Sequence, residues 1–300
     1  MLSKSIIRES YGDKLFLVLV YTFLAIILIT VLYPLWFVVI SSFSSSDAVI
    51  QGEVWFWPVR PTLFGYEAVF KYPMIWRSYS NTIVYTASGS AISVLLSIMM
   101  AYPLSKPTFY GKKVFIWALL FALMFHGGLI PFYLTVKSLG MINTMWALIL
   151  PPALNIFSVF IAKTFFQTTI SKDLYESTQI DGCGDIGFIW RMVIPLSMPI
   201  IAVLFLWAAV TSWNSYFSAL VFLNTKELFP LQLILREILV LNDIANGGMN
   251  LSPEEYKKFE DMRTLLKYSV IVFASFPILC LYPFLQRYFV KGVMLGSLKE

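Results

Sequence analysis

Charge, histidine and cysteine are all scarce in this 300-residue chain. Only 13% of the residues are charged, against roughly 25% in an ordinary soluble domain, and 58% are hydrophobic. The mean hydropathy is +0.75. This composition excludes an ordinary soluble domain and predicts an integral membrane protein, and the long uncharged runs described below predict that it is all-α.

The residues that most enzymes need are also missing. The chain holds one histidine, His126, and no residues spaced as metal ligands or as a Ser/His/Asp triad, so we expect neither an enzyme nor a bound metal. No Gly-x-x-x-x-Gly-Lys-Ser/Thr loop is present to hold ATP phosphates, since Gly111-Lys112 lacks the upstream glycine. We therefore expect no cofactor on this chain and any ATP on partner chains.

The two cysteines and the positive charge suggest no other class of function. Cys183 falls in a predicted cytoplasmic loop and Cys280 in a predicted membrane helix, so we expect both to be reduced and unpaired. The formal net charge is +5, but no basic stripe with interleaved aromatic residues supports nucleic-acid binding. The charge is better explained by membrane orientation.

Long runs with little charge predict six membrane-spanning helices, because a span needs about 20 apolar residues. The runs cover residues 15–46, 78–105, 114–136, 141–162, 192–225 and 268–286. The first is too long for a signal peptide and lacks a small-x-small cleavage site, so we expect it to be retained. The second carries small residues at four-residue spacing, which is typical of closely packed membrane helices. These residues are Gly89, Ser93, Ser97 and Ala101.

Lysine and arginine are distributed unevenly between the two sides of this predicted topology. The two ends and the loops 106–113 and 163–191 hold 12 of them, whereas the short loops on the opposite side hold 4. The long 226–267 segment is not counted, because the positive-inside rule holds for short loops. We therefore expect both termini and the 163–191 loop to be cytoplasmic.

Two further helices are predicted between the last two spans. Residues 229–241 form a mostly apolar stretch around Arg236-Glu237, which predicts a helix that either lies in the outer interface or packs against the other spans. The sequence Ser252-Pro-Glu-Glu255 is a capping box and predicts the start of a helix that leads into the sixth span.

The loop between spans four and five has its own signals. Ser171 is a helix N-cap, Asp173 lies where the helix dipole favours an anion, and Gly182 is a C-terminal cap. Gly184-Asp185 is a second N-terminal cap, and Pro195 precedes the next hydrophobic run. The pattern predicts a helix, a tight glycine turn and a second helix over residues 171–195.

This loop resembles the EAA motif of the permease subunits of ATP-binding-cassette (ABC) importers, whose commonest form is Glu-Ala-Ala, then Gly, then Ile-x-Leu-Pro. Here it runs Glu176-Ser-Thr, then Gly182, then Met192-Val-Ile-Pro195. Further segments resemble the carbohydrate-uptake subfamily that imports oligosaccharides. They are His126-Gly-Gly-Leu-Ile-Pro131, Trp213-Asn-Ser215, Pro230-Leu-Gln-Leu-Ile-Leu-Arg-Glu237 and Tyr282-Pro-Phe-Leu-Gln-Arg-Tyr-Phe-Val-Lys-Gly292.

The resemblance implies a type I importer permease fold. Residues 1–76 would hold the N-terminal tail, first span and outer loop, residues 77–290 the permease core, and residues 291–300 a cytoplasmic tail. The 171–195 helices would couple the permease to an ATPase. The residues that carry this role would be Glu176, Ser177, Thr178, Asp181, Gly182 and Pro195. On spacing alone, an ordinary solvated loop whose glycine merely ends a helix is the alternative.

Four residues are candidates for the substrate path. His126 lies mid-span beside two glycines, where an ionisable group is either functional or hydrogen-bonded between helices, and we expect it to face a subunit interface rather than lipid. Trp213, Asn214 and Tyr216 combine a stacking surface with amide and hydroxyl groups that suit a sugar, although an aromatic belt explains the rings equally well.

The function implied by the resemblance is that of the permease subunit of an importer, which carries an oligosaccharide that an external solute-binding protein delivers and that partner ATPase subunits drive across the membrane. The implied partners are a sister permease, two ATPase subunits, the binding protein and the oligosaccharide, in a bacterial cell membrane. Two alternatives stay open at this point. One is a permease of the same fold for a non-sugar cargo, and the other is a membrane receptor or scaffold without transport.

Overall fold

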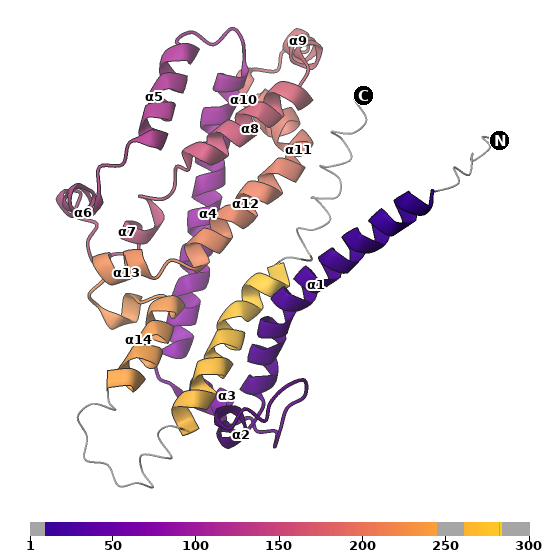
Figure 1. The fold of residues 1–300 in the computed structure, drawn as a ribbon. Helices are drawn as coiled ribbons and strands as arrows, with labels where there is room; N and C mark the ends of the chain where they lie inside the picture. The colour runs from indigo at the N-terminus through magenta and orange to yellow at the C-terminus, as the bar shows by residue number, and fades with distance from the viewer. Residues whose placement is uncertain (1–9, 245–260, 282, 284–300) are drawn as a thin grey trace. The chain divides into compact units, whose positions relative to one another are not determined.

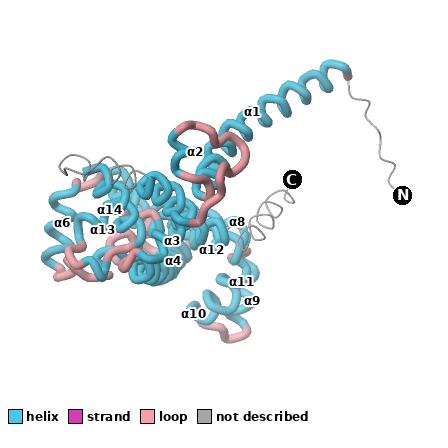
Figure 2. The backbone as a smooth tube through the Cα atoms, turned by 90° about the horizontal axis from the view of Figure 1, so that it is seen from below, coloured by secondary structure: helices cyan, strands magenta, loops and turns pink. Residues whose placement is uncertain are grey.

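Every regular element in the described part of the chain is helical, which agrees with the predicted class. The computed structural model describes residues 10–244, 261–281 and 283. Figure 2 shows helix and loop, without strand, over these residues. The described chain divides into two compact units, residues 10–71 with 261–273, and residues 72–244 with those from 274 onward.

The first unit opens with α1 (Tyr11–Ser42), the long N-terminal helix of Figure 1. A capping box fixes its start, since the Ser10 hydroxyl accepts from the Gly12 N–H and the Asp13 carboxylate accepts from the Ser10 N–H. Its 32 residues span about 48 Å, more than the ~30 Å of a hydrocarbon core. α1 is therefore long enough for the predicted first span.

Two short helices complete the beginning of the first unit, α2 (Ser46–Ile50) and α3 (Phe64–Lys71). The helix Asp261–Leu281 contributes its residues up to 273 to the same unit. A Cβ added to Gly65 of α3 would lie 3.0 Å from the Leu265 carbonyl oxygen of that helix. The absent side chain therefore allows the two backbones to pack closely.

The second unit is built around α4 (Ile75–Ser105), which packs along α8 (Ile156–Thr169) and α12 (Met198–Trp213). The predicted row of small residues, Gly89, Ser93, Ser97 and Ala101, is buried. A Cβ on Gly89 would lie 3.4 Å from the Ser212 Oγ atom of α12. The row therefore serves close helix packing, as predicted.

The predicted third span is interrupted where the sequence indicated. Its two halves are α5 (Lys112–Met124) and α6 (Leu129–Ser138), and they are bent by 116° relative to each other. His126 lies in the connection, and Gly128 just before α6 has a φ of +84°, which favours glycine. The break is confirmed, but the bend is much sharper than a kink within one straight span.

The predicted fourth span, 141–162, is wrong as a single helix. Only α7 (Trp146–Ile149) forms in its first half, and α8 begins after Asn155, whose side chain caps it by accepting from the Ser158 N–H. Pro151-Pro152 lies in the gap, and proline cannot donate a helical hydrogen bond. α8 also continues beyond the predicted boundary at 163.

The predicted fifth span, 192–225, is likewise composite. A bend of 82° separates the helical stretch that ends at Leu196 from α12. α12 stops at Trp213, and α13 (Phe217–Phe222) follows after a short connection. The sixth predicted span overlaps the helix Asp261–Leu281, whereas the predicted capping box at 252–255 lies outside the described residues.

The predicted amphipathic helix at 229–241 is α14 (Leu231–Ile244). Leu231, Leu233 and Ile234 are almost completely buried, and the helix packs against α4. The Leu231 N–H donates to the buried Thr82 hydroxyl of α4 at 2.7 Å. α14 is therefore packed within the second unit, which decides between the two predicted placements.

Three helices of the described chain are long and apolar enough to cross a membrane, and five spans result if each bent pair is one span. α8 has 14 residues, or about 21 Å, which is shorter than the hydrocarbon core. The structure therefore supports a protein with several membrane helices, while the count of six stays a prediction.

Candidate functional site

The predicted helix, glycine turn and helix are present at the end of the second unit. α9 (Lys172–Ile180) begins where the Ser171 hydroxyl accepts from the Leu174 N–H at 3.2 Å. Gly182 has a φ of +74°, and the Cys183 N–H closes the turn by donating to the Thr178 carbonyl at 3.0 Å. We call residues 171–196 the coupling segment.

The return arm of the coupling segment differs from the single α-helix that was expected. α10 (Asp185–Phe188) continues into a π-helical turn, Ile189–Val193, and then into α11 (Ile194–Leu196). Pro195 lacks the N–H that would continue the ladder, so the wider turn ends next to it. Pro195 therefore helps to set the sharp change of direction that follows at Ser197.

The predicted coupling residues divide into inward and outward groups. Thr178 is buried, and its hydroxyl donates to the Leu174 carbonyl at 3.1 Å, so it packs the helix. The Ser177 hydroxyl also bonds within α9. Glu176 and the C-cap Asp181 are exposed, and Glu176 pairs with Lys172 at 3.1 Å.

The outward side of the coupling segment also carries apolar residues that sequence reasoning missed. Ile180 is 87% exposed at the end of α9, and Ile186 is 75% exposed in α10. Trp190 in the π-helical turn is exposed as well. The sequence signal for this surface was the presence of Ile180 and Ile186 directly beside the acidic residues of the turn. Exposed apolar side chains that lie close together often mark a contact with another protein.

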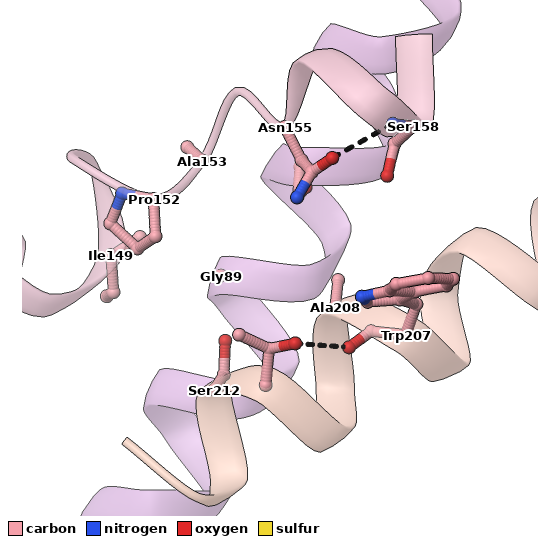
Figure 3. A pocket seen from close by; sticks show the side chains of 11 residues that line it. Gly89, Ile149, Pro152, Ala153, Asn155, Ser158, Trp207, Ala208 and Ser212 are labelled. Atoms are coloured by element: carbon pink, nitrogen blue, oxygen red, sulfur yellow. Dashed lines mark hydrogen bonds between the residues drawn. The ribbon is translucent and has the colours of Figure 1, made fainter. Parts of the chain in front are cut away.

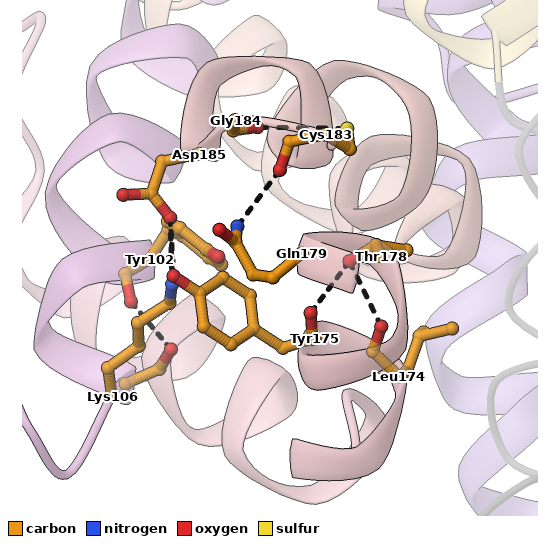
Figure 4. A network of polar contacts seen from close by, with 10 residues as sticks. Tyr102, Lys106, Leu174, Tyr175, Thr178, Gln179, Cys183, Gly184 and Asp185 are labelled. Carbon is orange, nitrogen blue, oxygen red and sulfur yellow. Dashed lines mark hydrogen bonds and ion pairs between the residues drawn. The ribbon is translucent and has the colours of Figure 1, made fainter. Parts of the chain in front are cut away.

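A polar network joins the coupling segment to the end of α4 (Figure 4). The Lys106 ammonium lies 3.2 Å from Asp185 Oδ1 and 3.4 Å from the centroid of the Tyr175 ring. The Tyr175 hydroxyl donates to the same carboxylate oxygen at 2.8 Å. On the other side, the Tyr102 ring lies 4.7 Å from the ammonium. Sequence reasoning did not identify this network.

The electrostatics of the network favour an ionised Asp185. The hydrogen bond from Tyr175, followed by the contact with Lys106, holds the pKa of the Asp185 carboxyl below its usual range. Asp185 is nevertheless 65% exposed, so this contact is partly screened by water.

Aromatic packing also holds the return arm of the coupling segment against the rest of the second unit. Phe188 of α10 is fully buried, and its ring packs edge-on against Tyr175 at 5.3 Å between centroids. The Phe188 ring also lies 6.2 Å from the Tyr102 ring, and Phe166 of α8 packs edge-on against Tyr102 at 6.4 Å between centroids. The coupling segment therefore rests on both α4 and α8 rather than standing free in solvent.

Two adjoining cavities lie further along α4. The smaller, of about 40 Å³, is bounded by Gly89 and Ser93 of α4, by Asn155, the N-cap of α8, and by Trp207 and Ser212 of α12 (Figure 3). The larger, of about 330 Å³, shares Pro152, Thr211 and Ser212 with it and includes Thr82 and Tyr85 of α4. Neither is lined by a charged residue.

The structure brings two of the four predicted path residues together. Asn214 and Tyr216 line the larger cavity. Trp213 is only 4% exposed, donates to the Ala274 carbonyl at 3.0 Å and packs against Tyr79, so it supports the wall rather than forming its surface. His126 is exposed and lines neither cavity.

Within the described chain, no group of three or more His, Cys, Asp or Glu side chains is placed to hold a metal ion. The site therefore consists of a protruding segment, its anchor on α4 and uncharged cavities.

Comparison with known proteins agrees with this description. A family described as "Binding-protein-dependent transport system inner membrane component" matches residues 76–295. Over 275 residues the chain is 41% identical to Protein LplC of Bacillus subtilis (strain 168), covering 90% of each chain. It is 38% identical over 287 residues to the polygalacturonan/rhamnogalacturonan transport system permease protein YtcP of the same strain, covering 96% of this chain and 99% of that one.

A solved structure shares the fold. It is described as a bacterial ABC transporter involved in the import of the acidic polysaccharide alginate, and one of its chains matches with a TM-score of 0.83 and 31% identity. The match covers 94% of this chain and 99% of that chain. This chain thus belongs to the family of binding-protein-dependent transport system inner membrane components, which are transport proteins of the membrane and not enzymes.

Proposed function

We propose that this chain is one of the two permease subunits of an ABC importer that carries an oligosaccharide. The observation that carries the proposal is the agreement between the family match and two relatives, at 38% and 31% identity, whose descriptions name polysaccharide transport. A solute-binding protein would deliver the sugar from outside. A sister permease would complete the path, and two ATPase subunits would supply the energy.

The proposed topology has six spans with both termini in the cytoplasm. The excess of lysine and arginine, 12 against 4, supports it. In this arrangement α5 with α6 counts as the third span, α7 with α8 forms the fourth, and α12 with α13 forms the fifth, while the stretch before Ser197 belongs to the cytoplasmic coupling segment. The division into residues 1–76, 77–290 and 291–300 remains part of this proposal.

The coupling segment is proposed to dock onto an ATPase subunit. Ile180 and Ile186 are exposed apolar side chains next to the exposed carboxylates of Glu176 and Asp181. A partner surface with an apolar hollow and a basic rim would bury the isoleucines and pair with the acids. Gly182 and Pro195 would set the directions of the two arms of the coupling segment.

The larger cavity beside α4 is proposed as this chain's share of the sugar path. Tyr216 is 45% exposed and presents a ring that a pyranose face can stack on. The Asn214 amide nitrogen donates to the Val210 carbonyl at 2.9 Å, and Asn214 lines the cavity. Its amide oxygen is an acceptor that a sugar hydroxyl can use. Trp213 would hold this wall in place.

His126 is proposed to face the sister subunit. Its exposed imidazole lies between α5 and α6, where the chain is sharply bent and backbone groups also need partners. Burial of unpaired imidazole nitrogens in lipid would cost several kcal/mol each, whereas a subunit interface can supply hydrogen bonds.

Reconstitution tests the proposal directly. The chain, its sister permease, the ATPase and the solute-binding protein would be purified together and placed in proteoliposomes. Uptake and ATP hydrolysis would then be measured with neutral oligosaccharides, acidic oligosaccharides, amino acids and peptides. We expect an oligosaccharide to stimulate both activities. Stimulation by an amino acid or peptide alone would refute the sugar cargo. ATP hydrolysis by the isolated, pure chain would refute the proposal that only the partner ATPase subunits hydrolyse ATP.

A further inference from the structure

Lys106 occupies a position where three parts of the second unit meet. It is the C-cap residue of α4, and its side chain is only 23% exposed. Tyr175 reaches it from α9 and Asp185 from the start of α10, so both arms of the coupling segment contact one ammonium group (Figure 4).

The partners of Lys106 do not substitute easily for one another. Asp185 compensates the charge at 3.2 Å, and the Tyr175 ring covers one side of the ammonium at 3.4 Å. The Tyr175 hydroxyl also donates to that carboxylate at 2.8 Å, so the three groups form a closed triangle. A closed triangle with two directional contacts resists sliding, whereas ring packing around Phe188 alone does not.

α4 carries this attachment to the cavities. It is one helix of 31 residues, about 46 Å long, that carries Pro103 in its last turn and ends at the network. Gly89 and Ser93 in its middle line the smaller cavity, and Thr82 and Tyr85 line the larger one. Lys106 and the walls of both cavities are therefore joined by a single helix, along which a displacement at Lys106 can be transmitted.

We propose that Lys106 is a positioning residue that locks the coupling segment to α4, so that movement of the segment becomes movement of α4 and of the cavity walls. The inference rests on the proposed function for its cargo and its motor, but the lock itself is a property of this chain. Without the lock, a push on the segment would be absorbed by bending at the turn around Gly182 and at the break at Ser197.

The first test uses the complete transporter in proteoliposomes and measures sugar moved per ATP hydrolysed. Lys106→Met keeps a long side chain but removes the charge, and we expect the ratio to fall on the order of fivefold, the lower end of usual coupling between sites. Lys106→Arg, which restores a cation over the rings, should recover most of it. Lys113→Met, on the neighbouring exposed lysine, is the matched control and should leave the ratio unchanged.

A double substitution separates the lock from general damage. If Lys106 acts through Asp185, then Lys106→Met and Asp185→Asn together should lower the ratio no further than either does alone. Co-purification of the partner subunits shows whether assembly is intact. An unchanged ratio in assembled Lys106→Met transporter, or effects that simply multiply in the double variant, would overturn the proposal.

A second readout does not depend on transport. In a Cys280→Ala background Cys183 is the single thiol of this chain, and it lies in the turn that the lock holds. Lys106→Met, but not Lys113→Met, should speed the reaction of Cys183 with a maleimide in membranes. Equal labelling rates would overturn the lock even if sugar uptake is observed. Absence of ATP-driven sugar uptake in wild-type transporter, with faster labelling in Lys106→Met, would refute the proposed function and leave the lock standing.

Discussion

The turn at Gly182 offers a prediction whose size follows from the structure. Its φ of +74° is a left-handed conformation, and a Cβ built there meets nothing within 4 Å. Substitution therefore adds backbone strain and no collision. Gly182→Ala should destabilise the turn by about 1–2 kcal/mol, Gly182→Asn by less because asparagine tolerates this region, and Gly182→Pro by the most because its φ is fixed near −65°.

The assay for this series has two parts. Thermal unfolding of the purified transporter should rank the variants glycine, asparagine, alanine, proline, and ATP-driven uptake should follow the same order, with no uptake for Gly182→Pro. Gly184→Ser is the control two residues away, because Gly184 has an ordinary φ of −70° and open space around it, and serine is a good N-cap. Wild-type behaviour of Gly182→Pro, or equal losses at Gly184, would show that the conformation of this turn does not matter.

Three further predictions concern other charged or ionisable groups. Glu176→Lys should abolish ATP-driven uptake while the protein still inserts, since it reverses an exposed charge proposed to meet the ATPase; uptake at the wild-type rate would contradict this. His126→Leu should lower uptake or uncouple ATP hydrolysis with assembly preserved, whereas unchanged kinetics and stability would remove His126 from the path. Because the pKa of Asp185 is lowered, its ionised form stabilises the folded protein, by about 0.5 kcal/mol after allowance for its exposure. This stabilisation is present at pH values above the ordinary pKa of about 3.9 and is lost as the pH falls through the lower pKa of the folded protein. The difference in melting temperature between wild type and Asp185→Asn should therefore persist at neutral pH and vanish in acid.

Local signals in the sequence were sufficient for several elements. The helix cap at Ser171 and the turn at Gly182 involve residues at most five positions apart, so their geometry follows from the types of residue present. The same holds for the break beside Gly128. α14 was predicted from the apolar pattern of residues 229–241, which is also a local signal in the sequence.

Hydropathy by itself misjudged the continuity of two predicted spans. It averages over a window and gives Pro151 and Pro152 little weight, although their missing N–H groups end the helical ladder there. The predicted span 141–162 is therefore split between α7 and α8. The bend at Ser197 was missed for the same reason, since apolar residues continue on both sides of it.

The sequence by itself determined that this is a helical membrane protein with a capped, glycine-turned segment, because composition and short-range capping decide those features, and the resemblance to the EAA motif rests on the residue types within that segment. Only the tertiary structure decided which residues of other helices contact that segment. Lys106 and Asp185 are 79 positions apart, and no spacing rule relates them. The tertiary structure also showed that Trp213 is buried while Asn214 and Tyr216 line a cavity. Both outcomes depend on how distant helices pack, since a side chain's neighbours are set by the returning chain rather than by its own stretch of sequence.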